Sequence, residues 1–229
     1  MNFANNQKRG FTLAEVLITL GIIGVVAAIT IPTVITNYKA ARLKSQFLKS
    51  YSTIQQVFKR MQDDEISTDP SSYTDGASFY KVFASYIAGA TTCYISNSPL
   101  CPKYGRDVYA GIRWMYLDDG QILLPDGTLL MFENMKNGSV VFVTVDLNGI
   151  KNPPNIEGYD TFTFQLINGE LHTMGDIGTA YVGEKYCDID AILKDVAIGR
   201  RESKFGLSCA HYAKIEHDYF KKVVKKYKY

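Results

Sequence analysis

Glu15 is the acidic residue whose place in the sequence most needs a chemical explanation. It lies at the start of a long apolar stretch, and residues 16–35 carry no charge at all. A carboxylate at the centre of a membrane helix costs about 2.5–3.5 kcal/mol on insertion scales, and intramembrane acids are generally paired and functional. We therefore expect Glu15 to seek a cationic partner that neutralises it.

A second group of oxygen-bearing side chains lies in residues 146–160, DLNGIKNPPNIEGYD. Four of them could supply the oxygen ligands that calcium prefers: Asp146, Asn148, Glu157 and Asp160. Ile150 and Lys151, however, occupy the fifth and sixth places of the loop, where an EF-hand needs an oxygen ligand and a glycine. Calcium is thus the candidate cofactor, with an Asx-type turn at residues 146–149 as the alternative. No other cofactor is expected.

The four cysteines are candidate disulfide partners: Cys93, Cys101, Cys187 and Cys209. An even number fits disulfides in an exported domain, although the sequence leaves their connectivity open. A bridge from Cys187 to Cys209 would close a loop of about twenty residues and contribute about 3 kcal/mol in the chain-entropy model. Zinc is the less favoured alternative, because no C-x-x-C pair is present and His211 follows Cys209 at an unusual spacing.

The three histidines are His172, His211 and His217, and none has a recognisable catalytic partner spacing. The sequence contains no nucleophile elbow and no P-loop. We interpret the histidines as surface or packing residues and expect no enzyme activity, so an anchored enzyme is an alternative without supporting residues. The formal net charge of +2 argues neither for nor against a nucleic-acid partner.

The element that must position Glu15 is a helix long enough to cross a membrane. Twenty residues at about 1.5 Å each span about 30 Å, the thickness of the hydrocarbon core. Lys8 and Arg9 precede the stretch, so the positive-inside rule leaves the first ten residues in the cytoplasm and delivers the rest outward. A single-pass anchor with an incidental acid is the simplest alternative.

The helix is predicted to continue beyond the membrane as an amphipathic rod. From Lys39 onward, apolar residues recur mostly at three- and four-residue steps: Leu43, Phe47, Leu48, Tyr51, Ile54, Val57, Phe58 and Met61. Asp63 and Asp64, followed by residues 68–72 with Pro70, end this pattern. We therefore predict one helix of about fifty residues, far longer than the usual globular helix.

The rest of the chain reads as an antiparallel meander of about four to six strands with a few short helices. Candidate strands cover residues 112–117, 121–124, 128–132, 139–146, 161–166 and 170–174. Turns at 125–127 and 168–169 connect two pairs of them. Residues 78–87 and 188–198 are predicted helices. Residues 220–229, with five lysines and no acid, indicate a solvated tail or a frayed helix; the alternative is a contact with single-stranded DNA or an anionic surface.

Residues 10–15, Gly-Phe-Thr-Leu-Ala-Glu, behind two basic residues and before an uncharged stretch, resemble the class III signal of type IV pilins and type II secretion pseudopilins. The resemblance covers residues 8–62 and implies an α+β, pilin-like fold. A long helix would pack on an antiparallel meander, with a disulfide-stapled C-terminal region. It also implies that prepilin peptidase cuts between Gly10 and Phe11, that Phe11 is then N-methylated, and that Glu15 serves assembly. Pro32 would loosen or kink the helix in a filament.

The resemblance divides the chain into a cytoplasmic leader (1–10), a transmembrane and filament-core helix (11–36), an amphipathic continuation (37–62) and an exported globular domain (63–229). It implies a single-pass precursor in the cytoplasmic (inner) membrane, with the globular domain outside the cytoplasm, and later an extracellular or periplasmic filament. The expected partners are copies of the chain, other pilins, prepilin peptidase and an inner-membrane assembly platform. The expected function is a structural filament subunit; the alternative is a minor tip pilin that binds DNA or surfaces.

Overall fold

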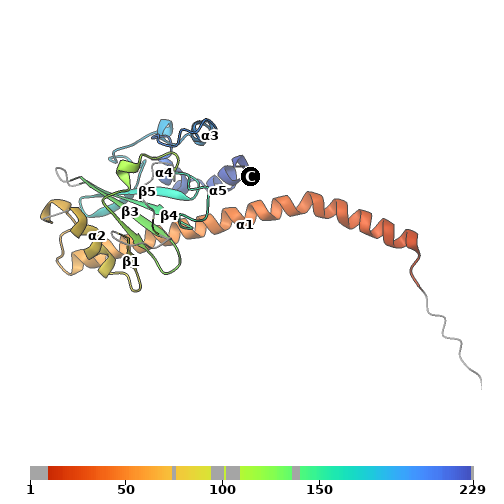
Figure 1. Ribbon diagram of the computed structural model, residues 1–229, viewed down its shortest axis with the longest axis horizontal. Helices are drawn as coiled ribbons and strands as arrows, with labels where there is room; N and C mark the ends of the chain where they lie inside the picture. Colours follow the sequence, from red (N-terminus) through yellow and green to blue (C-terminus); the bar gives the residue numbers. More distant parts are fainter. Residues whose placement is uncertain (1–9, 74–75, 94–100, 102–108, 136–139, 228–229) are drawn as a thin grey trace, which may run out of the picture. The chain divides into compact units, whose positions relative to one another are not determined.

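The apolar and the amphipathic stretches form one helix, α1 (Leu13–Asp63), in a computed structural model of the chain (Figure 1). The structure describes residues 10–73, 76–93, 101, 109–135 and 140–227; the rest of the leader, including Lys8 and Arg9, lies outside them. The chain forms two units, Met1–Lys39 and Ala40–Tyr229, and α1 contributes to both. The predicted long helix is confirmed.

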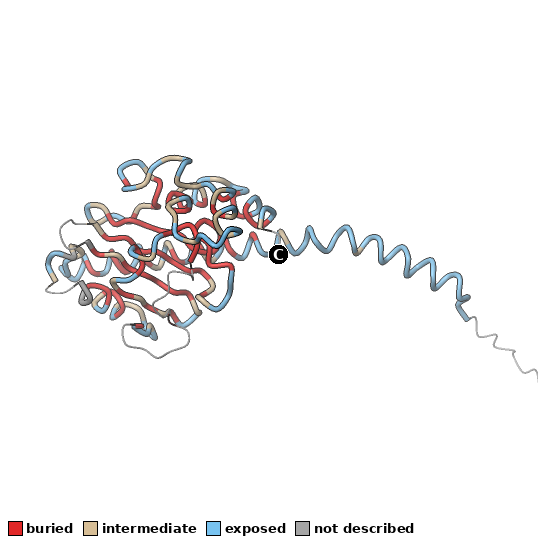
Figure 2. The backbone as a smooth tube through the Cα atoms, turned by 45° about the horizontal axis from the view of Figure 1, so that its top comes forward, coloured by how far each residue is buried: buried red, intermediate tan, exposed pale blue. Residues whose placement is uncertain are grey.

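In the first unit, α1 exposes large apolar side chains on every side. Figure 2 shows this part of the helix as almost uniformly exposed. The exposed apolar residues include Leu17, Ile18, Leu20, Ile22, Ile23, Val25, Val26, Ile29, Ile31 and Val34. The helix has the length and the apolar composition to cross a membrane, with a mean hydropathy of 2.4 over its most apolar window. Water is a poor solvent for such a surface, so a membrane or a protein partner must cover it.

In the second unit, the same helix buries one stripe. The buried residues are Ala40, Leu43, Phe47, Ser50, Ile54, Val57, Phe58 and Met61. Their three- and four-residue steps confirm the predicted amphipathic pattern. Leu48 was expected in the stripe but is 46% exposed, because it lies about 100° around the helix from Phe47. The compact unit therefore begins at Ala40, since the helix belongs to its core.

In the described part of the chain, six strands form one antiparallel sheet in the order β1-β2-β3-β4-β5-β6. They are β1 (Thr91–Thr92), β2 (Gly120–Leu123), β3 (Leu129–Met135), β4 (Val140–Asp146), β5 (Thr161–Ile167) and β6 (Glu170–Thr173). The turn at Asn168-Gly169 joins β5 to β6, and both of its residues adopt a positive φ. The predicted meander is confirmed, while the two-residue β1 was not anticipated from the sequence.

One face of the sheet packs on α1 and on α2 (Gly76–Ser85). The Phe47 ring lies 4.9 Å from the Phe162 ring, and the Phe83 ring lies 5.1 Å from the Phe132 ring, measured between centroids. Alternation along the strands directs Phe132 and Phe162 to this face. Gly120 in β2 has a packing reason, because a Cβ there would overlap the ring of Tyr80.

The opposite face of the sheet is covered by loops rather than by a long helix. Tyr109, Ile112, Leu117, Met174 and Leu207 form a second buried cluster there. The prediction of a strand at residues 112–117 is wrong: the segment contains a 3-10 turn, η2 (Trp114–Tyr116), whose apolar residues cover the sheet instead of joining it. A short apolar run fits either role, because burial alone does not require a strand.

Short helices complete the second unit. They are η1 (Pro70–Ser72), η3 (Glu184–Tyr186), α3 (Ile189–Ala197), α4 (Cys209–Ile215) and α5 (Tyr219–Lys226). The predicted helix at 188–198 is confirmed, with the Asp188 side chain capping it at Ala191 N. Of the two forms predicted for 220–229, a solvated tail or a frayed helix, the described part is a helix. It is not merely solvated, because α5 buries Phe220, Val223 and Val224. Its apolar residues recur at helical spacing among the lysines.

Candidate assembly site

Thr12 and Glu15 form a reciprocal hydrogen-bonded pair at the start of α1. The backbone N–H and the hydroxyl of Thr12 each donate to Glu15 Oε2 at 2.8 Å. The backbone N–H of Glu15 donates to Thr12 Oγ1 at 3.2 Å. This is a capping box, in which residues at the N-cap and N3 positions satisfy each other's free amides. The S/T-x-x-E spacing is visible in the sequence, and it gives Glu15 a local role in helix capping that was not predicted beside its expected role in assembly.

Gly10 and Phe11 precede the helix and are exposed, with Phe11 at 89%. A Cβ built on Gly10 would meet no atom of the described chain within 4 Å. The fold itself therefore does not require glycine at this position. Any requirement for it must come from a molecule that recognises the segment.

Pro32 lies inside α1, and the helix continues on both sides of it. Its ring nitrogen has no hydrogen to donate, so the carbonyl four residues earlier loses its usual helical partner. The Thr36 hydroxyl donates to the Pro32 carbonyl at 2.8 Å. A loosened helix at Pro32 within a filament stays a prediction.

Residues 5–31 match the family model of the prokaryotic N-terminal methylation motif. The chain carries the class III prepilin signal of type IV pilins and pseudopilins. No curated protein and no solved structure matches it significantly. The signal implies processing by prepilin peptidase and assembly into pilin filaments, and it indicates a structural rather than a catalytic protein. Together with the apolar helix it fits a membrane-anchored precursor.

The architecture agrees with the signal. A long N-terminal helix, an antiparallel six-stranded sheet and disulfides in the C-terminal region confirm the predicted α+β, pilin-like fold. The motif covers only the N-terminal residues of the chain, whereas the sheet and the disulfides lie entirely outside it. The fold is thus an observation independent of the motif.

Two disulfides connect Cys93 to Cys101 and Cys187 to Cys209, with Cα–Cα distances of 5.6 and 4.7 Å. The first closes a short loop beside β1, and the second joins the end of η3 to the first residue of α4. No free cysteine lies among the residues described. The pairing removes the thiols that a zinc site would need.

The carboxylates of Asp146 and Asp160, two of the candidate calcium ligands, accept hydrogen bonds from backbone amides of the same loop. Asp146 Oδ1 accepts from the amides of Asn148 and Gly149, which is the Asx-type turn considered as the alternative. Asp160 accepts from the amides of Asn155 and Ile156. Within the described ranges, these carboxylates do not converge as a ligand cluster. Calcium binding here stays a prediction.

Glu157 is fully buried between the sheet and the surrounding loops. The Thr163 hydroxyl donates to its Oε1 at 2.7 Å, while Oε2 has no hydrogen-bond partner among the residues that the structure describes. Gly206 packs so closely against Glu157 that a Cβ there would overlap it. Burial raises the pKa of Glu157 to about 8 and, together with the nearby Asp146 charge, that of Asp160 to about 7. Both acids are therefore held protonated at pH values where exposed carboxyls are charged.

A separate acidic cluster beside the sheet was not predicted from the sequence. The carboxylate oxygens of Asp118, Asp119 and Glu133 lie within 4.8 Å of one another. Burial and the two aspartates raise the pKa of Glu133 to about 8. The Asp118-Asp119 pair is visible in the sequence, but its approach to Glu133 depends on the β2–β3 pairing. Asp119 also accepts from the Asn134 amide, so part of the cluster serves the fold.

The histidines prove to be structural or exposed within the described chain. His211 Nδ1 lies 2.6 Å from Asp176 Oδ1, and the Thr173 hydroxyl donates to the same oxygen at 2.7 Å. This network ties α4 to the turn after β6. Burial acts to raise the pKa of Asp176, but the hydrogen bonds with His211 and Thr173 outweigh it and hold that pKa below its usual value. His172 lies 3.9 Å from Glu170 at the surface.

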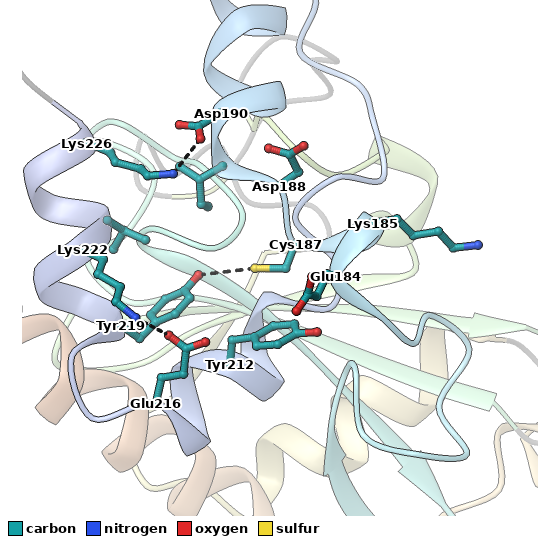
Figure 3. Close-up of a pocket in the computed structure, with 12 residues that line it drawn as sticks. Glu184, Lys185, Cys187, Asp188, Asp190, Tyr212, Glu216, Tyr219, Lys222 and Lys226 are labelled. Atoms are coloured by element: carbon teal, nitrogen blue, oxygen red, sulfur yellow. Dashed lines mark hydrogen bonds and ion pairs between the residues drawn. The ribbon is translucent and has the colours of Figure 1, made fainter.

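A groove of about 510 Å³ runs between η3, α3, α4 and α5 (Figure 3). Tyr219, at its base, lies 3.9 Å from the sulfur of Cys187. Lys222 pairs with Glu216 at 3.1 Å, and Lys226 pairs with Asp190 at 2.7 Å. These pairs connect α5 with the end of α4 and with α3, so the groove contributes to packing of the C-terminal helices.

Proposed function

We propose that the chain is a structural subunit of a type IV pilus-like or type II secretion pseudopilus filament. One observation carries the proposal: the Thr12–Glu15 box begins a wholly exposed apolar helix that continues into a compact, disulfide-bonded domain. A domain that folds around its own core has no need of such a helix for stability. The helix is instead suited to contact lipid in the membrane precursor and the helices of other subunits in the filament.

The chemistry of maturation follows from the position of Glu15. A cut after Gly10 would create a free amine at Phe11. The next residue is Thr12, whose backbone N–H donates to the Glu15 carboxylate at 2.8 Å. Glu15 is held by Thr12 in the single chain, which satisfies its carboxylate without a partner. In a filament the amine of a neighbouring Phe11 would offer Glu15 a full charge in place of a neutral amide. An inner-membrane assembly platform would bring the two chains together.

The test of this proposal replaces Glu15 while leaving membrane insertion intact. We expect Glu15→Ala to accumulate in the membrane fraction but to yield far fewer sheared filaments, because the charge pairing is lost. Thr19→Ala serves as a matched control, since the Thr19 hydroxyl only bonds the Val16 carbonyl of its own helix. Normal filaments from Glu15→Ala would contradict the proposal.

Processing is tested separately at Gly10. We expect Gly10→Leu to leave the precursor uncut, which mass spectrometry detects as retention of the ten-residue leader. Because a side chain at Gly10 meets nothing in the described fold, the loss is attributable to recognition by the peptidase. Efficient cleavage of Gly10→Leu would show that cutting occurs elsewhere or needs no glycine.

The alternative of a minor tip pilin that binds DNA or surfaces depends on the lysines of α5. Lys221 and Lys225 are exposed, and the described chain gives neither an ion pair. Deleting residues 220–229 would remove core residues such as Phe220 and so would not test binding alone. The double variant Lys221→Gln/Lys225→Gln leaves the core intact. Unchanged DNA retention by that variant would argue against this role.

A further inference from the structure

The lysines of α5 divide into two pairs with different surroundings. Lys222 and Lys226 point to the groove and bind Glu216 and Asp190, as Figure 3 shows. Lys221 and Lys225 lie one helical turn apart on the other flank, are exposed, and have no ion pair recorded within the described chain. The helix therefore keeps two positive charges free for an external partner.

Contacts along α1 place α5 toward the Ala40 end of the second unit. Lys214 of α4 lies over the Tyr51 ring, with its Nζ 4.8 Å from the centroid. Phe220 of α5 packs on Phe47, with centroids 5.8 Å apart. Passing from α4 to α5 thus moves about one turn of α1 closer to Ala40. Figure 1 shows α5 beside this part of α1.

The same end of α1 carries two more cations without a recorded ion pair in the described residues. Arg42 is exposed and Lys44 is half-buried. In the sequence, Arg42 follows Ile35, the last residue of the apolar stretch, by only seven residues. A span that fills the hydrocarbon core therefore leaves Arg42 and Lys44 at the level of the lipid headgroups.

We propose that Arg42, Lys44, Lys221 and Lys225 form a basic collar that binds anionic phospholipid headgroups at the outward surface of the membrane. Each cation near an anionic surface contributes favourably, and the attraction decays within a Debye length of about 8–10 Å. The collar would hold the domain on the membrane before assembly. The proposal rests on the membrane-anchored precursor and applies to either kind of filament.

Lipid fits the collar better than single-stranded nucleic acid does. A nucleic-acid groove combines cations with exposed aromatic rings on which bases stack. In α5 the aromatic Phe220 is only 3% exposed, and the Tyr227 ring packs on the Tyr159 ring at 5.1 Å. The described part of α5 therefore offers charges without stacking surfaces. Headgroup phosphates need only the charges.

The test inserts the full chain into nanodiscs of phosphatidylcholine alone or of phosphatidylcholine with phosphatidylglycerol. Amine-reactive footprinting with mass spectrometry then measures the labelling rate of individual lysines. We expect Lys221 and Lys225 to be labelled severalfold more slowly in the anionic discs. Lys59, which is exposed and paired with Asp63 in the last turns of α1, should be labelled equally in both. Raising the salt to about 1 M should remove the difference, because screening then acts within about 3 Å.

A variant with two charges removed sharpens the test. The double variant Arg42→Gln/Lys44→Gln should weaken the protection of Lys221 and Lys225. Each charge removed should lower the ratio of lipid-bound to unbound collar by about fivefold. Lys59→Gln is the matched control and should leave protection unchanged.

Equal labelling in both discs would overturn the proposal. Protection by a single-stranded oligonucleotide but not by anionic lipid would overturn it in favour of nucleic acid. A chain that fails to co-purify with the nanodiscs would instead contradict the membrane-anchored precursor on which the proposal rests.

Discussion

The two halves of α1 use one secondary structure in opposite ways. In residues 13–39 the large apolar side chains are exposed, and in residues 40–63 they are buried along one stripe. The first half has apolar residues on every side, whereas the second alternates them with Lys and Arg at helical spacing. The pattern of side chains, rather than the helix itself, therefore decides which surroundings each half needs.

The two units of the chain also differ in how they accommodate acidic side chains. Glu15 stays at the helix start, where backbone and hydroxyl donors of Thr12 satisfy it. The second unit instead buries Asp146, Glu157 and Asp160 beneath its loops, where burial raises their pKa values. The carboxylate at the helix start is stabilised by hydrogen-bond donors of its own chain, whereas the buried acids are stabilised by protonation.

The largest expected effect separates the two halves by stability. Phe47→Ala should lower the free energy of unfolding by about 3–5 kcal/mol, because it removes a fully buried ring that contacts Phe162 and Phe220. Leu17→Ala, in the exposed half, should change it by less than about 0.5 kcal/mol. Denaturation of the full chain in detergent, followed by fluorescence of Trp114, measures both. Equal losses would abolish the distinction between the halves.

The two disulfides should differ in their contribution to the second unit. Replacing Cys187 and Cys209 with serine should cost about 3 kcal/mol, because this bridge spans 22 residues of sequence. Replacing Cys93 and Cys101, which are 8 residues apart, should cost about 0.5–1 kcal/mol less. Thermal unfolding of the two double variants under non-reducing conditions gives the comparison. A larger loss from the shorter loop would show that strain or unfolded-state structure outweighs chain entropy.

Buried acids predict a stability that falls as pH rises. Glu157 has an ordinary pKa of 4.5 and a folded value of about 8, so between these values the folded chain keeps a proton that the unfolded chain has lost. Stability is therefore full below about pH 4.5 and decreases toward pH 8, by on the order of 1 kcal/mol per pH unit for one group. Glu157→Gln should flatten this slope. Urea denaturation at pH 5, 6, 7 and 8 measures it.

The control for the pH experiment is Glu170→Gln. The Glu170 side chain is 83% exposed, so this substitution should leave the pH slope of the unmodified chain in place. If Glu157→Gln retained the full slope, the proton held by the second unit would belong to another group, and Asp160→Asn would be the next variant.

The smallest expected effect concerns the start of the exposed half. Thr12→Ala removes both hydroxyl hydrogen bonds of the capping box and should destabilise the first turn by about 1 kcal/mol. Amide hydrogen exchange of residues 13–16 in detergent should accelerate accordingly. Thr30→Ala is the matched control, because the Thr30 hydroxyl only bonds the Val26 carbonyl within the helix. Unchanged exchange in Thr12→Ala would mean that Glu15 is not held by the box.

Local pattern carried much of the prediction. The apolar stretch, the amphipathic stripe from Leu43 to Met61, and the turns around Asp126 and Gly169 were predictable because each depends on residues a few places apart. The strand predicted at 112–117 failed because its apolar residues are buried by covering the sheet from outside. The lysines of α5 concealed an apolar face whose partners lie on α1 and β5.

The prepilin signal, the length of the helix and the class of fold could be predicted from the sequence, because each depends on residues close together in the chain. The folded chain was needed to establish which cysteines pair and that Glu157 is buried against Gly206 and Thr163. It was also needed to show that Lys222 and Lys226 form ion pairs, whereas Lys221 and Lys225 form none with the described residues. Each of these depends on contacts between distant segments. The charge state of an acid and the partner of a cysteine or lysine depend on the neighbouring groups, and these neighbours are brought together only when the chain folds.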